Sequence, residues 1–280
     1  MEYEIRQATR EELDIAISWA ANEGWNPGLY DGDTYFSTDP KGFFMGFLDG
    51  QPISSISAVA YNNNFGFLGF YIVKSKYRNK GYGFKLWNEA LKHLPTQNIG
   101  LDGVIAQQEN YKKSGFVPAY RNIRYEGTGI ETLISDPNLV SMSEINFDKL
   151  LSYDNSIFPT SRPIFLKSWI QQPNSLAIGY VKDSVIMGYG MVRPCQTGFK
   201  VGPLFADSKD IANVIFQKLQ NFVGKQNRIY LDVPEINKDA MELTKSNVMK
   251  PMFETTRMYT KGIPNTPVNK VFGVTTFELG

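Results

Sequence analysis

The sequence predicts an α/β (α+β) protein of two tandem domains, each a mixed, largely antiparallel sheet flanked by helices. Two observations lead to this prediction. In the first half, short apolar runs typical of strands alternate with segments whose apolar residues recur at helical spacing. The second half repeats the first at an offset of 133 residues, so that Gly69 corresponds to Gly202. A long register with few gaps indicates duplication of a whole domain.

The elements of the first half can be assigned in order along the chain. Thr9 and Glu12 form a capping box, which opens a helix. Asp49-Gly50 suits the turn of a hairpin. The elements expected after the first helix are a loop at 22–35, hairpin strands at 43–48 and 53–61, a strand at 67–73, a helix at 83–94, a strand at 99–105, a short helix at 110–114 and a final strand at 116–125.

The second half shows a similar order of elements. Pro251 and Arg257 occupy the positions of Pro118 and Arg124 in the repeat register. The elements expected are hairpin strands at 176–181 and 185–192, a helix capped by Ser208 and ended by Gly224, and strands at 228–233 and 253–259. Each of the two halves therefore has the pattern of one complete domain.

The most informative segment is a basic loop between a predicted strand and a predicted helix. Gly81 and Gly83 let the backbone approach a ligand closely, and Arg78 and Lys80 add positive charge. The first amides of a helix lack internal partners and lie at the positive end of its dipole, which favours a phosphate group. The spacing matches neither the Gly-x-x-x-x-Gly-Lys-Ser/Thr loop nor the Gly-x-Gly-x-x-Gly dinucleotide motif. A loop with glycines for tight packing is the alternative interpretation.

This Arg-x-x-Gly-x-Gly pattern resembles the acyl-CoA pyrophosphate loop of the GNAT N-acyltransferase superfamily. Segments at 24–30, 188–195 and 202–207 look like a tandem subgroup of that family, so the resemblance covers nearly the whole chain. It implies acetyl-CoA or another acyl-CoA as cosubstrate, and no metal. The cofactor-binding residues that it implies are Ile72 and Val73 at the strand end, and Arg78, Asn79, Lys80, Gly81, Tyr82, Gly83 and Phe84 in the loop and helix start.

A tyrosine is the candidate catalytic residue. Asn110-Tyr111-x-x-Ser114-Gly115-Phe116 resembles the Asn-x-x-Tyr-x-x-x-Gly-Phe segment of the same family, although the asparagine here directly precedes the tyrosine. In that family the tyrosine protonates the leaving CoA thiolate, so the resemblance implies Tyr111 as the catalytic acid. An aromatic side chain packed at an interface is the alternative.

The sequence does not identify a general base. The strand at 67–73 carries no acidic residue. Asp102 on the next strand is a candidate, but Asp232 occupies the matching place in the second half, which favours a structural role for both. His93 lies near the end of a helix, where a favourable dipole contact explains it better than catalysis.

The second half lacks the features of the predicted phosphate loop. In the repeat register, Ile211 replaces the arginine, and Val214 and Phe216 replace the two glycines. The sequence therefore predicts one acyl-CoA site, in the N-terminal domain. The degenerate second domain either supports the fold or walls the acceptor pocket.

Composition excludes several classes of function. A net charge of +1 argues against nucleic acid as the main partner. Cys195 is the sole cysteine, which excludes an intrachain disulfide and a cysteine-based zinc cluster. The charged N-terminus lacks a signal-peptide core and no run approaches the ~20 apolar residues of a membrane span, so a cytoplasmic protein without a membrane partner is expected. Breaks in periodicity at 127–143 predict domains at 1–130 and 144–280.

These observations and the resemblance together predict an acyl-CoA-dependent N-acyltransferase. It is expected to transfer acetyl from acetyl-CoA to the amine of a small molecule or amino acid, as a monomer or homodimer. The loop at 24–36 is expected to cover the acceptor, and Arg193 either contacts an acceptor carboxylate or forms a surface salt bridge. The alternatives are a non-catalytic CoA-binding, sensor or interaction module, and a protein or peptide N-acetyltransferase.

Overall fold

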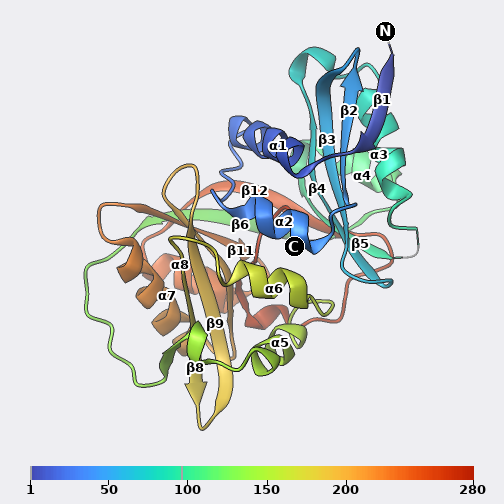
Figure 1. Ribbon diagram of the computed structural model, residues 1–280. Helices are drawn as coiled ribbons and strands as arrows, with labels where there is room; N and C mark the ends of the chain where they lie inside the picture. The colour runs from blue at the N-terminus through green and yellow to red at the C-terminus, as the bar shows by residue number, and fades with distance from the viewer. Residues whose placement is uncertain (1, 96) are drawn as a thin grey trace.

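The computed structural model describes residues 2–95 and 97–280, which form one continuous sheet of 13 strands (Figure 1). The strands are β1 (Tyr3–Gln7), β2 (Phe43–Leu48), β3 (Gln51–Ala60), β4 (Phe65–Val73), β5 (Asn98–Val104), β6 (Val117–Thr128), β7 (Leu139–Ser141), β8 (Leu176–Lys182), β9 (Val185–Pro194), β10 (Phe199–Ala206), β11 (Arg228–Pro234), β12 (Lys250–Tyr259) and β13 (Val271–Gly273). Their order is β1-β2-β3-β4-β5-β12-β6-β11-β10-β9-β8-β7, and β13 pairs with β10 beside this path. The predicted fold class is confirmed, since the pairs β4–β5 and β10–β11 are parallel within a mainly antiparallel sheet.

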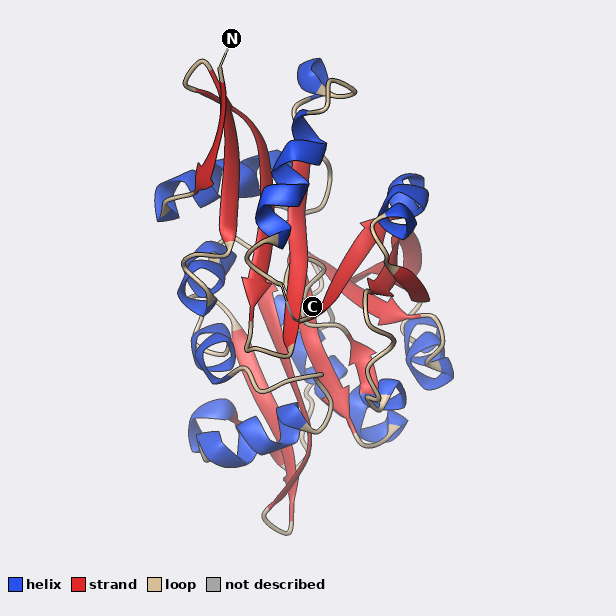
Figure 2. Cartoon of the chain, turned by 90° about the vertical axis from the view of Figure 1, so that its right-hand side faces the viewer, coloured by secondary structure: helices blue, strands red, loops and turns tan. Residues whose placement is uncertain are grey.

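Helices lie on both faces of the sheet (Figure 2). They are α1 (Arg10–Asn22), α2 (Asp31–Thr38), α3 (Tyr82–Leu91), α4 (Gln108–Lys113), α5 (Phe147–Asn155), α6 (Pro163–Trp169), α7 (Lys209–Val223) and α8 (Lys238–Ser246), with short 3-10 turns at 75–77, 105–107, 142–144 and 268–270. The predicted capping box of Thr9 and Glu12 opens α1, and Ser208 caps α7. Among the residues that the structure describes, no helix has the length and apolar character needed to cross a membrane.

The internal duplication predicted from the sequence accounts for the order of the elements. A shift of 133 residues carries α2 onto α6, β2 and β3 onto β8 and β9, and β4 onto β10. The same shift carries α4 onto α8 and β6 onto β12. The strand order is symmetric about the β12–β6 pair, so the two copies are arranged around a pseudo-twofold axis at the centre of the sheet.

The two halves exchange their last strands. β12, from the end of the second half, pairs with β5 of the first half, and β6, from the end of the first half, pairs with β11 of the second. The two exchanged strands also pair with each other, which joins the half-sheets without a free edge between them. The sequence predicted the strand at 116–125 but not its partners, because alternation of apolar residues does not specify which strand lies alongside.

Matching ion pairs hold each exchanged strand in place. Arg124 of β6 binds Asp232 of β11 with Nε–Oδ1 at 2.7 Å and Nη2–Oδ2 at 2.8 Å. Arg257 of β12 binds Asp102 of β5 with Nε–Oδ1 at 2.9 Å and Nη2–Oδ2 at 2.7 Å. The aspartates and arginines correspond in the repeat register, which confirms a structural role for both Asp102 and Asp232.

One expectation about the first half was wrong. The segment 22–35 was expected to be a loop, but α2 begins within it at Asp31. The sequence of α2, DGDTYFST, has low intrinsic helix propensity. Tertiary contacts override this propensity, because the buried Asp31 carboxylate accepts a hydrogen bond from the Gly28 amide at 2.9 Å and pairs with Arg193 from the second half.

The C-terminal segment 274–280 passes between the two half-sheets. A Cβ atom on Gly69 of β4 would lie 2.2 Å from the carbonyl oxygen of Glu278. A Cβ atom on Gly202 of β10 would lie 2.3 Å from the carbonyl oxygen of Thr275. The two glycines that match in the sequence repeat therefore both make room for this segment.

Gly69→Ala should lower the free energy of unfolding by about 1–3 kcal/mol, because the new methyl group must displace backbone. Equilibrium unfolding in urea measures this change. Gly127→Ala in β6 is a matched control, since its Cβ would come closest to the flexible Met249 side chain, at 3.0 Å, and would meet no backbone atom among its nearest neighbours. Equal losses in the two variants would contradict the close packing of the C-terminal segment on β4.

Candidate active site

A cavity of about 430 Å³ opens between the ends of β4 and β5. The first half supplies the strand ends, the loop before α3, and parts of α3 and α4, including Tyr71, Ile72, Val73, Arg78, Asn79, Gly81, Gly83, Phe84, Trp87, Gly103 and Tyr111. The second half supplies Phe253, Thr255, Phe277 and Glu278. The predicted phosphate loop and the predicted catalytic tyrosine thus face one cavity.

The cavity exists because β4 and β5 separate. They pair in parallel only from Phe65–Asn98 to Leu68–Leu101. Beyond that point the register of β4 against β3 shifts, and Phe70 has a φ of +48°. This bulge re-aims the end of β4, so that its backbone faces the cavity instead of β5.

The loop before α3 is shaped for an anion. Asn79 and Gly81 have φ values of +61° and +82°, and Gly81 is the N-cap of α3. Because Gly81 has no side chain, the first amides of α3 are left uncapped. A Cβ atom on Gly81 would meet nothing within 4 Å, whereas one on Gly83 would lie 2.6 Å from the Tyr71 hydroxyl. Gly81 therefore leaves space at the helix end, and Gly83 allows α3 to pack closely on β4.

The structure brings most of the predicted cofactor-binding residues to the cavity. Those lining it are Ile72, Val73, Arg78, Asn79, Gly81, Gly83 and Phe84. Lys80 and Tyr82 do not line it; the Tyr82 ring instead packs on Tyr3 at 4.7 Å. The Nε of Arg78 donates to the carbonyl of Val73 at 2.8 Å, and its guanidinium also pairs with Glu23.

Tyr111, which lies on α4, also lines the cavity. Its ring stacks on Trp87 with centroids 5.6 Å apart, and a Cβ atom on Gly103 would lie 2.4 Å from the ring. Only 8% of the residue is exposed. Burial raises the pKa of Tyr111 above its ordinary value of about 10, so its phenol stays protonated at neutral pH.

The equivalent opening in the second half is closed by the chain itself. β10 and β11 pair only from Phe199–Ile229 to Val201–Leu231. β13 then pairs with β10, and the amide of Val274 donates to the carbonyl of Asp232 on β11 at 2.8 Å. The backbone of 271–274 therefore occupies the space that is a cavity in the first half.

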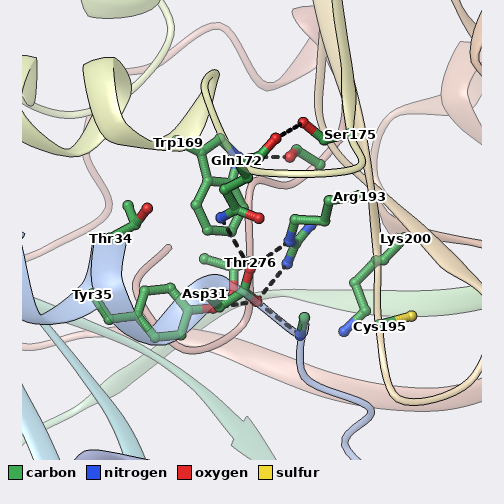
Figure 3. A network of polar contacts seen from close by, with 12 residues as sticks. Asp31, Thr34, Tyr35, Trp169, Gln172, Ser175, Arg193, Cys195, Lys200 and Thr276 are labelled. Atoms are coloured by element: carbon green, nitrogen blue, oxygen red, sulfur yellow. Dashed lines mark hydrogen bonds and ion pairs between the residues drawn. The ribbon is translucent and has the colours of Figure 1, made fainter. Parts of the chain in front are cut away.

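A buried ion pair joins the start of α2, directly after the loop at 24–30, to the second half (Figure 3). Asp31 and Arg193 are both 0% exposed, with Nε–Oδ1 at 2.7 Å and Nη2–Oδ2 at 3.1 Å. Trp169 lies under the guanidinium at 4.2 Å from the ring centroid, and Tyr35 donates to Asp31 at 3.1 Å. Arg193 is therefore neither a surface residue nor an acceptor ligand. Trp25 is the member of this loop that lines the cavity.

The other polar candidates have structural partners. His93 Nε2 lies 2.7 Å from Asp39 Oδ2, and neither residue lines the cavity. Asp102 lines the cavity, but its carboxylate is bound by Arg257 and by the Asn122 amide. Within the part of the chain that the structure describes, no group of three or more His, Cys, Asp or Glu residues could hold a metal ion.

Comparisons with known proteins agree with this geometry. Residues 4–116 match a family model described as "Acetyltransferase (GNAT) family", and residues 150–273 match one described as "Acetyltransferase (GNAT) domain". Holothin acyltransferase of Pseudoalteromonas sp. (strain SANK 73390) is 28% identical over 275 residues, which is 98% of this chain and 94% of that protein. The uncharacterized N-acetyltransferase YitH of Bacillus subtilis (strain 168) is 27% identical over 201 residues, 69% of this chain and 70% of YitH.

Solved structures share the fold over most of the chain. A crystal structure from Pyrococcus horikoshii, of a protein provisionally assigned as an acetyltransferase, has a TM-score of 0.85 at 24% identity and covers 99% of this chain and 96% of its own. A tandem GNAT protein from the clavulanic acid biosynthesis pathway has a TM-score of 0.62 at 10% identity, over 92% of this chain and 98% of its own. Since models of one family match successive halves of the chain, the protein belongs to the GNAT acetyltransferase family, as an acyltransferase with two tandem GNAT domains.

Proposed function

We propose that this acyltransferase transfers an acetyl group from acetyl-CoA to the amine of a small molecule. The observation that carries the proposal is a single cavity that the uncapped start of α3, the separated ends of β4 and β5, and Tyr111 all face. These three parts suit the three parts of an acyl-CoA: the pyrophosphate, the extended pantetheine arm and the thioester.

Each residue has a role that its position supports. Asn79, Gly81 and the first amides of α3 bind the pyrophosphate, with Arg78 adding charge after it releases Glu23. The backbone of Ile72 and Val73 binds the pantetheine arm. Lys80 and Tyr82 lie beside the cavity and are assigned to the rest of the nucleotide. Tyr111 protonates the thiolate when the carbon–sulfur bond breaks, because burial keeps its phenol protonated.

The proposal includes one active site, formed by the domain at 1–130 and completed by the domain at 144–280. β13 occupies the corresponding space in the second domain, and the residues there offer no glycine loop. A small acceptor is favoured over a peptide or protein, because the loop at 24–30 and the C-terminal segment both border the acceptor end of the cavity. One relative is, by its name, an acyltransferase that acts on holothin.

Isothermal calorimetry with acetyl-CoA tests this proposal. The wild-type protein should bind one equivalent, and Gly81→Ala should raise the Kd at least tenfold, because a side chain at the helix start strains the loop that faces the pyrophosphate. Gly224→Ala is a matched control, since Gly224 has a φ of +75° and equally open surroundings but ends α7 in the second half. No binding by the wild-type protein, or equal loss in both variants, would contradict the proposed cofactor site.

A further inference from the structure

The far wall of the cavity is built by the second half of the chain. Phe253 and Thr255 reach it on the exchanged strand β12, and Phe277 and Glu278 reach it on the C-terminal segment. With Trp25, these residues form an end of the cavity rich in aromatic rings. The second half thus contributes side chains to a site whose phosphate loop lies in the first half.

Three carboxylates line the cavity, and they differ in their partners. Glu23 forms an ion pair with Arg78. Asp102 accepts hydrogen bonds from Nε and Nη2 of Arg257. Glu278 forms no ion pair with a lysine or arginine of the described residues, although it is only 3% exposed. Arg124 and Lys200 interact with its charge only at longer range. A buried carboxylate without a directly paired cation is unfavourable, so its presence beside a cavity points to a cationic ligand.

The surrounding residues fix Glu278 in position. The Thr276 hydroxyl donates to Oε2, the Tyr35 hydroxyl lies 3.4 Å from the same oxygen, and the Glu278 amide donates to Thr276 Oγ1 at 3.2 Å. Its backbone packs against Gly69. These contacts use Oε2 and the backbone, and none of the hydrogen bonds of the described residues uses Oε1.

The aromatic side chains on this wall are also held in place. The guanidinium of Arg124 lies 4.9 Å from the ring centroid of Phe277 and 5.8 Å from that of Phe253. Arg124 is itself fixed by Asp232. The rings therefore present a fixed apolar surface beside the carboxylate, which suits an acceptor with a flat apolar body and an amino group.

We infer that Glu278 binds the ammonium group of the acceptor and removes its proton, and that the acceptor is an aromatic primary amine held by Trp25, Phe253 and Phe277. This inference rests on the proposed acetyltransferase function. It assigns the general base to the C-terminal segment of the degenerate domain, which thereby completes the active site instead of only supporting the fold.

The reaction balances with the residues present. The ammonium gives one proton to the Glu278 carboxylate, and the freed nitrogen lone pair attacks the thioester carbonyl. A carbon–nitrogen bond forms and the carbon–sulfur bond breaks. The thiolate takes the phenol proton of Tyr111, and the nitrogen loses its second proton to solvent as the amide forms. Glu278 then returns its proton to solvent and the Tyr111 phenolate takes one back, so acetyl-CoA and the ammonium give the amide, CoA and one proton.

The test uses the full-length protein with acetyl-CoA and three probes: tryptamine, tyramine and phenethylamine. Release of the CoA thiol gives kcat/KM, and calorimetry gives the Kd for acetyl-CoA. Glu278→Gln should lower kcat/KM about 100-fold or more while the Kd for acetyl-CoA stays within twofold. Glu254→Gln is the control, because this exposed glutamate pairs with Arg121 outside the cavity and its loss removes the same charge. It should leave both constants unchanged.

The outcomes separate this inference from the proposed function. If the wild-type protein binds acetyl-CoA but acetylates none of the three amines, or if Glu278→Gln stays within threefold of wild type, the role of Glu278 is wrong and the cofactor site stands. If acetyl-CoA does not bind, the proposed function itself fails. Should Glu278→Gln not fold, Glu278→Asp keeps the charge but shortens the side chain, and is expected to lower kcat/KM about tenfold with unchanged acetyl-CoA affinity.

Discussion

Tyr111→Phe should lower kcat for acetyl transfer by about 10²- to 10⁴-fold while the Kd for acetyl-CoA changes little. The phenylalanine ring can still stack on Trp87 and fill the space beside Gly103, so the cavity keeps its shape. What is lost is the proton for the departing thiolate. Steady-state release of the CoA thiol gives kcat, and calorimetry with acetyl-CoA gives the Kd.

Tyr125→Phe is the matched control for this experiment. Tyr125 is also 8% exposed, but its hydroxyl points to Met241 Sδ at 3.7 Å in the second half, away from the cavity. We expect its kcat to stay within twofold of wild type. If Tyr111→Phe also remains within threefold, the tyrosine is a packing residue and the thiolate leaves without its help.

The cofactor end of the site could be predicted from the sequence because its determinants are local. The phosphate loop, the strand before it and the helix after it occupy one short stretch, and the two glycines have fixed positions relative to the helix start. The repeat register also identified Asp102 and Asp232 as a matched pair. Their arginine partners, Arg257 and Arg124, match in the same register, although the sequence did not show that the strands carrying them change places.

The acceptor end could not be predicted, because it is assembled from distant segments. Glu278 lies two residues from the end of the chain, in a segment with no helix or strand pattern. It reaches the cavity only because Gly69 leaves space on β4 and because β12 has entered the first half-sheet. The strand at 67–73 has no acidic residue. The proposed base, the Glu278 carboxylate, comes from the other domain instead.

The same reasoning applies to the second domain. Loss of its glycines indicated that it does not bind a pyrophosphate, but no residue pattern indicated what fills the opening. The backbone of β13 fills it, pairing with β10 where a cofactor would otherwise lie. Short strands of three residues have no detectable period, so this device is visible only in the structure.

Asp31→Asn should lower the free energy of unfolding by about 3–5 kcal/mol, the second large effect expected in this protein. The substitution leaves the Arg193 guanidinium charged and 0% exposed between the two halves, with Trp169 under it and no carboxylate in front. A neutral asparagine amide does not compensate the cost of burying the charged guanidinium away from water. Equilibrium unfolding in urea at neutral pH gives the change, and a single transition is expected because the halves share one sheet.

Asp33→Asn is the matched control, because Asp33 lies on the same helix and pairs with Arg10 at the surface, with 82% of its side chain exposed. It should lower the free energy of unfolding by less than about 1 kcal/mol.

The dependence of stability on pH is a second test of the Asp31–Arg193 pair. Burial alone would raise the pKa of Asp31, but the charge and hydrogen bonds of Arg193, the charge of Lys200 and the Gln172 amide together lower the pKa overall. The stabilisation from this carboxylate is therefore complete above the unfolded-state pKa of about 3.9 and is lost as pH falls through the lower folded-state value. The stability of wild type and Asp31→Asn should converge only in that acidic range, and a difference that already disappears near pH 6 would show that another group is responsible.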